Sequence, residues 1–70
     1  MTNKRFLKSK MKWFGDTNNS LSLYLGISES AFSAKMNHYK GAEFRQGEIE
    51  KICNKYRLTE SELHSIFFAQ

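Results

Sequence analysis

The sequence has no proline, only four glycines and a single cysteine in 70 residues. Proline and glycine mark the corners of strand-rich folds, so their scarcity favours helices joined by short turns. The lone cysteine, Cys53, excludes an internal disulfide framework and is typical of a protein in a reducing cytoplasm. No apolar run approaches the roughly 20 residues of a membrane-spanning helix, and no secretory signal follows the basic N-terminus. We therefore expect one cytoplasmic domain over residues 1–70, with no membrane partner.

Acidic residues are absent from residues 1–15, although this segment carries the five bases Lys4, Arg5, Lys8, Lys10 and Lys12. The remaining residues hold six bases and seven acids, so the net charge of +4 of the whole chain comes from the first 15 residues. A basic field attracts polyanions, of which DNA is the most common. The same charges also fit a solvated helix face that keeps a protein soluble. Charge alone does not decide between these two interpretations.

Apolar residues recur at helical spacing in five segments, which predicts an all-α fold. In residues 4–14, Leu7, Met11 and Phe14 form one face. We expect Trp13 to flank that face in the core, as aromatic residues of amphipathic helices usually do. The other predicted helices begin at Thr17 or Asn18, at Ser28, at residue 46 and after Thr59, and residues 38–43 form a loop.

The segment from Asn18 to Asn37 has the spacing of a helix-turn-helix. Gly26 permits the left-handed backbone of a tight turn, and Ser28 provides the N-cap of the second helix of the pair. Leu21, Leu25, Ile27 and Phe32 are spaced to fill the wedge between the two helices.

These residues resemble the Cro/repressor (XRE-like) class of helix-turn-helix regulators, and the resemblance covers almost the whole chain. It is carried by Leu-Gly-Ile-Ser at 25–28, Phe-Ser-Ala-Lys-Met-Asn at 32–37 and Ala-Glu-Phe at 42–44. The last motif, with Glu-Ile-Glu-Lys-Ile at 48–52, is similar to small phage Cro-like proteins, modulators of repression (antirepressors) among them. The resemblance implies a five-helix repressor-like bundle whose second and third helices form the helix-turn-helix. It also implies transcriptional regulation of a lysis/lysogeny switch in a bacterial host cell.

The resemblance further implies which residues face operator DNA. Asn18 matches a position where the class often has a glutamine that holds a phosphate. The other contacts would come from the exposed face of the third helix and the loop after it: Ser28, Glu29, Ser30, Ser33, Ala34, Asn37, Tyr39 and Lys40.

The sequence departs from the class at several positions. Lys35 stands where an aliphatic residue is common, and Arg45 replaces a small N-cap, which predicts a frayed start to the fourth helix. The third helix also lacks Arg, Gln and Asn before Asn37, although these side chains make the commonest bidentate base contacts.

Two hypotheses about the partner therefore stay open. The favoured one is a regulator that binds double-stranded operator DNA, as a homodimer. The alternative is an antirepressor that binds the phage repressor protein and alters its DNA binding. Phe67 and Phe68 are adjacent, so one helix face cannot bury both, and they are candidates for a dimer or partner contact.

An enzyme is the least favoured class of protein. His38 and His64 are isolated in the sequence, and Cys53 falls on the apolar stripe of the fourth predicted helix, where a thiol is usually part of the core. The acidic residues suggest no acid/base couple, and no metal-ligand spacing occurs. We expect no catalytic residues, no metal site and no cofactor.

Overall fold

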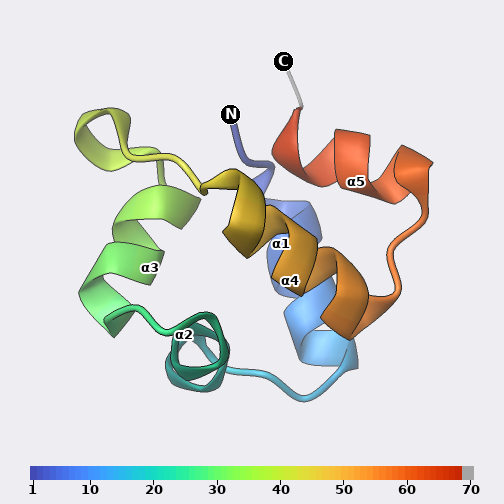
Figure 1. Cartoon of the computed structure of the whole chain (residues 1–70), viewed down its shortest axis with the longest axis horizontal. Helices are drawn as coiled ribbons and strands as arrows, with labels where there is room; N and C mark the ends of the chain where they lie inside the picture. Colours follow the sequence, from blue (N-terminus) through green and yellow to red (C-terminus); the bar gives the residue numbers. More distant parts are fainter. Residues whose placement is uncertain (69–70) are drawn as a thin grey trace.

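The computed structural model describes residues 1–68 of the chain. This part of the chain forms five α-helices and one short 3-10 turn, without strands, which confirms the all-α prediction (Figure 1). In chain order the elements are α1 (Lys4–Trp13), α2 (Asn18–Leu25), α3 (Glu29–Met36), η1 (Tyr39–Gly41), α4 (Gln46–Tyr56) and α5 (Glu60–Phe67). Within the described residues, no helix is long and apolar enough to cross a membrane.

The capping residues that the sequence suggests do start three of the helices. Thr17, Ser28 and Thr59 are the N-caps of α2, α3 and α5, and each hydroxyl accepts a hydrogen bond from the backbone N–H three residues later. These bonds satisfy N–H groups that have no partner inside the helix. The positions at which α2, α3 and α5 begin therefore follow from local sequence.

The start of α4 has a different kind of cap. Arg45 is its N-cap residue, and its side chain offers no acceptor. Instead, the Glu48 carboxylate accepts a hydrogen bond of 2.8 Å from the Arg45 backbone N–H. This acid, three residues inside the helix, supplies half of a capping box that the sequence did not suggest. The lack of a side-chain cap at Arg45 agrees with the expectation, and a frayed start stays a prediction.

One hydrophobic core joins all five helices. Phe44, in the segment before α4, packs edge-on against Phe32 of α3 and Phe67 of α5, with both ring-centroid distances at 5.7 Å. Residues from every helix complete the buried cluster: Leu7, Met11, Leu21, Leu25, Met36, Ile49, Ile52, Tyr56 and Ile66.

Trp13 does not lie in the core, contrary to the prediction. At 3.6 residues per turn it is about 160° around α1 from the buried Met11, so it points away from the bundle. Its side chain is 84% exposed. Phe14, also expected on the apolar face, is half exposed and stacks on Tyr56 with the ring centroids 4.8 Å apart.

The C-terminal helix closes the bundle against the first one. The backbone N–H of Asn3, the N-cap of α1, donates a hydrogen bond to the Ile66 carbonyl of α5, and Lys10 of α1 forms an ion pair with Glu62 of α5. The N-terminal segment consequently lies beside the end of α5 (Figure 1).

Candidate functional site

Three residues, Gly26, Ile27 and Ser28, connect α2 to α3. Gly26 has φ of +75°, a left-handed conformation that strains any residue with a Cβ. The Ile27 N–H donates to the Ser22 carbonyl at 3.1 Å, which closes the end of α2. In Figure 1, α2 is seen nearly along its axis and α3 is seen from the side, so the short turn between them changes the chain direction sharply.

The outer face of α3 and the segment that follows it bring together five of the nine residues that the resemblance assigns to DNA. One shallow hollow is lined by Ser30, Ser33, Ala34, Asn37 and Tyr39. The Asn37 Nδ2 donates to the Ser33 carbonyl at 2.8 Å, which holds the amide against the end of the helix. We call these five residues the α3 face.

The other four predicted residues lie around this face or apart from it. Lys40 is exposed in η1, with its Nζ 5.4 Å from the centre of the Tyr39 ring. Ser28 and Glu29 are exposed at the start of α3, where the Ser28 hydroxyl is occupied as the N-cap. Asn18 lies at the start of α2, in a separate hollow that it shares with Lys8 and Lys12 of α1.

The charge on the surface of α3 depends on the directions of its two charged side chains, Glu29 and Lys35. Glu29 is exposed, whereas Lys35 is mostly buried and forms an ion pair with Glu48 of α4, its Nζ lying 2.7 and 2.8 Å from the two carboxylate oxygens. The α3 face itself therefore carries no formal charge. Burial alone raises the pKa of Glu48, but the Arg45 N–H and the Lys35 ammonium outweigh burial and hold that pKa below its ordinary value.

A second polar cluster, which the sequence did not reveal, ties the start of α2 to α4. The Asp16 carboxylate accepts hydrogen bonds from the Tyr56 hydroxyl and from Ser20 Oγ, and Lys55 Nζ lies 3.6 Å away. Burial alone raises the pKa of Asp16, but these partners outweigh it and lower the pKa overall, so the carboxylate stays ionised. Burial, together with the bond to Asp16, raises the pKa of Tyr56, which keeps the phenol protonated.

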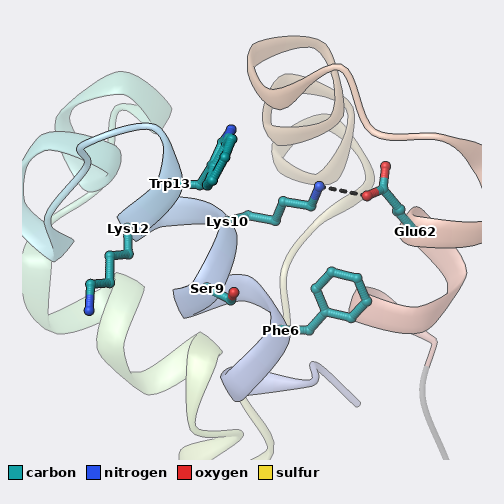
Figure 2. Close-up of a pocket in the computed structure, with 6 residues that line it drawn as sticks. All are labelled: Phe6, Ser9, Lys10, Lys12, Trp13 and Glu62. Carbon is teal, nitrogen blue, oxygen red and sulfur yellow. Dashed lines mark ion pairs between the residues drawn. The ribbon is translucent and has the colours of Figure 1, made fainter.

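A groove between α1 and α5 was also missed by the sequence analysis. It is lined by Phe6, Ser9, Lys10, Lys12, Trp13 and Glu62. Figure 2 shows the Lys10–Glu62 ion pair spanning from α1 to α5, with Phe6 on one side of the bridge and Trp13 on the other. Lys12 points to the opposite side of α1 from Lys10 (Figure 2).

Phe67 and Phe68, near the end of α5, have different environments, because one helix face cannot bury two adjacent residues. Phe67 is only 4% exposed and belongs to the core, so its assignment as a surface contact is corrected. Phe68 is 51% exposed and lies beside His64, with the ring centroids 5.4 Å apart.

The groups with catalytic potential are few in the described part of the chain. Burial, and the nearby charge of Glu50, raise the pKa of the half-buried Cys53 thiol and keep it protonated. His38 is not isolated in space, since its Nδ1 lies 2.7 Å from Glu43 Oε1. No group of three or more His, Cys, Asp or Glu residues suited to a metal ion occurs among residues 1–68.

Comparisons of the chain with protein-family models, with curated proteins and with solved structures find no match.

The Lys35–Glu48 ion pair that holds α3 to α4 generates a pH-dependent prediction. Replacing Glu48 with Gln leaves Lys35 without its counter-charge, so we expect the free energy of unfolding at neutral pH to fall by about 1–3 kcal/mol. Because folding lowers the pKa of Glu48, its contribution is present above the ordinary value of 4.5 and is lost as the pH falls below it. Denaturant unfolding followed by circular dichroism at neutral pH and at about pH 3 measures the difference.

The matched control is Glu50→Gln, which removes an exposed carboxylate from the same helix. We expect this control to change the free energy of unfolding by less than about 0.5 kcal/mol. A Glu48→Gln deficit that is as large at acidic pH as at neutral pH would show that the charge on Glu48 does not stabilise the fold.

Proposed function

We propose that the protein is a phage Cro-like transcriptional regulator that binds operator DNA through a helix-turn-helix formed by α2 and α3. The observation that supports this most is the α3 face, where five residues assigned to DNA on sequence resemblance line one continuous surface. The glycine turn at Gly26 and the N-cap at Ser28 support the same proposal, because they orient α3 relative to α2.

In this proposal α3 lies in the major groove. Ser30 and Ser33 contact base edges permissively, and Ala34 offers a methyl group to a thymine methyl. Asn37 is the one side chain of the α3 face suited to bidentate contact with adenine, after release of its bond to the Ser33 carbonyl. Asn18 and Lys40 contact phosphates, which position the domain without reading sequence.

A single copy of the domain covers one half-site, so the proposal includes a homodimer. Phe68 is exposed and follows directly after the last residue of α5. Its neighbour Phe67 is buried in the core. An apolar ring on a firmly packed helix is suited to a symmetric contact between two copies.

The alternative function, an antirepressor that binds the phage repressor protein, is favoured by the charge of α3. Its exposed surface carries Glu29 and no positive side chain, because Lys35 is turned toward Glu48. An acidic residue near phosphates is repulsive, whereas it would complement a basic protein surface. The exposed Trp13, and Leu23 at 71% exposure, are apolar anchors of the kind that protein interfaces bury.

The two functions are separated by titrating the protein against a duplex that contains the promoter region of its own operon, with and without the neighbouring repressor. As a DNA-binding regulator, the protein alone gives saturable binding that a mixed-sequence competitor does not abolish, and Asn37→Ala weakens it by about 1–3 kcal/mol. Fluorescence anisotropy of a labelled duplex measures both. Binding that requires the repressor, or release of bound repressor, would support the antirepressor function instead.

Removal of the Phe68 side chain tests whether the protein forms a homodimer through the end of α5. Phe68→Ala removes an exposed ring, so we expect the dimer to dissociate at least tenfold more readily in sedimentation equilibrium while the thermal unfolding midpoint stays nearly unchanged. Leu23→Ala is the control, since it also removes an exposed apolar side chain but from α2. Equal dissociation of wild type and Phe68→Ala would exclude α5 as the dimer contact.

A further inference from the structure

The bases of α1 are divided between two sides of the helix. Lys4, Lys8 and Lys12 follow one another at four-residue intervals and are all exposed. Within the described residues none of the three forms an ion pair, whereas Lys10 on the other side is paired with Glu62. Figure 2 shows this division directly, with Lys10 reaching to α5 and Lys12 extending the opposite way. We call Lys4, Lys8 and Lys12 the α1 lysine stripe.

The lysine stripe meets the start of α2. Lys8, Lys12 and Asn18 line the same shallow hollow, so two positive side chains stand beside a residue that matches a phosphate-contact position of the helix-turn-helix class. Sequence spacing did not predict this placement, because it depends on the path of the segment between α1 and α2, which contributes Asp16 and Thr17 to the same hollow. The fold thus brings the most basic segment of the chain next to the element that precedes the α3 face.

One acid, Asp16, also lines this hollow and opposes binding of an anion there. Its charge is already compensated on the protein. The carboxylate accepts two hydroxyl hydrogen bonds and lies 3.6 Å from the Lys55 ammonium. Lys8 and Lys12, by contrast, keep their charges uncompensated, so the hollow as a whole has positive character.

We propose that Lys8, Lys12 and Asn18 form a binding face for the sugar-phosphate backbone of double-stranded DNA, which Lys4 extends along α1. This rests on the proposed DNA-binding function and deepens it. Successive lysines of the stripe are about 6 Å apart along the helix axis, and duplex DNA presents one negative charge per about 1.7 Å of its own axis. Each ammonium therefore meets a phosphate without any requirement for a particular base.

In this proposal, affinity for DNA and selectivity for a site come from different helices. The α3 face carries no formal charge, so it gains little from counterion release, which supplies most of the free energy of non-specific DNA binding. The lysine stripe supplies that free energy, while the serines and Asn37 of α3 select the site. The uneven distribution of charge along the sequence, with five bases and no acid in residues 1–15, has a direct role in this arrangement.

The test is the salt dependence of binding to a mixed-sequence duplex of about 20 base pairs, for which phosphate contacts dominate. Three variants each remove one positive charge from an exposed lysine: Lys8→Gln, Lys12→Gln and Lys51→Gln. Lys51, on α4, is the control because it is outside the hollow and in no ion pair of the described residues. Fluorescence anisotropy at several salt concentrations gives the slope of log K against log salt. Circular dichroism melting checks that the variants stay folded.

We expect Lys8→Gln and Lys12→Gln each to reduce that slope by about one, a fourth variant that combines these two changes to reduce it by about two, and Lys51→Gln to leave it unchanged. Equal slopes for wild type and the Lys8 and Lys12 variants, with DNA binding retained, would overturn the phosphate face but leave the proposed function intact. An equal reduction in Lys51→Gln would likewise overturn it, because net charge alone would then account for the slope. Absence of any duplex binding by the wild type overturns both this inference and the DNA-binding function.

Discussion

Burial of Phe32 determines the direction in which α3 presents its outer surface. The ring is fully buried and packs edge-on against Phe44, which in turn packs against Phe67 of α5. Because Phe32 points inward, Ser30, Ser33 and Asn37 point outward at the complementary positions of the helix. The Gly26 turn and the Lys35–Glu48 ion pair fix the same helix at its start and on its flank. Every functional inference made for α3 depends on this anchoring.

The charges of the molecule are arranged around that anchored helix. Lys35, the one base in α3, is held by Glu48, so the α3 face carries only neutral side chains. Positive charge is instead concentrated on α1, whose Lys8 and Lys12 stand beside the start of α2. This separation of charge from the α3 face is consistent with phosphate contacts that position a domain and weak base contacts that select its site. The same neutral face, with Glu29 at its edge, is equally compatible with the proposed alternative of a protein partner.

Local sequence signals were sufficient for much of the fold. Hydroxyl caps at Thr17, Ser28 and Thr59 and the glycine at the end of α2 act within a few residues, so the sequence placed these helix ends, with Asn18 as the one alternative to Thr17. The grouping of Ser30, Ser33, Ala34 and Asn37 on one side of α3 also follows from helical periodicity once Phe32 is assigned to the core.

The features that the sequence did not reveal depend on contacts between distant elements. Whether Phe67 or Phe68 is buried is decided by where Phe44 lies, and the capping of α4 by Glu48 is coupled to its ion pair with Lys35 of α3. Trp13 is exposed although it is strongly apolar, because its angle around α1 turns it away from the side that Leu7 and Met11 bury. The hollow that joins Lys8 to Asn18 depends on the connection between α1 and α2, whose Asp16 and Thr17 also line it.

If the protein binds DNA as proposed, the outer surface of α3 is the contact surface. Amide chemical-shift mapping of the isotope-labelled protein during addition of promoter duplex tests it most directly, since it reports on every described helix at once. We expect the largest shifts at Ser30, Ser33, Ala34 and Asn37, with further shifts at Asn18 and an unchanged Trp13 indole signal. Shifts confined to Phe6, Trp13 and Glu62, with the amides of α3 unmoved, would contradict it and place the contact surface at the groove between α1 and α5.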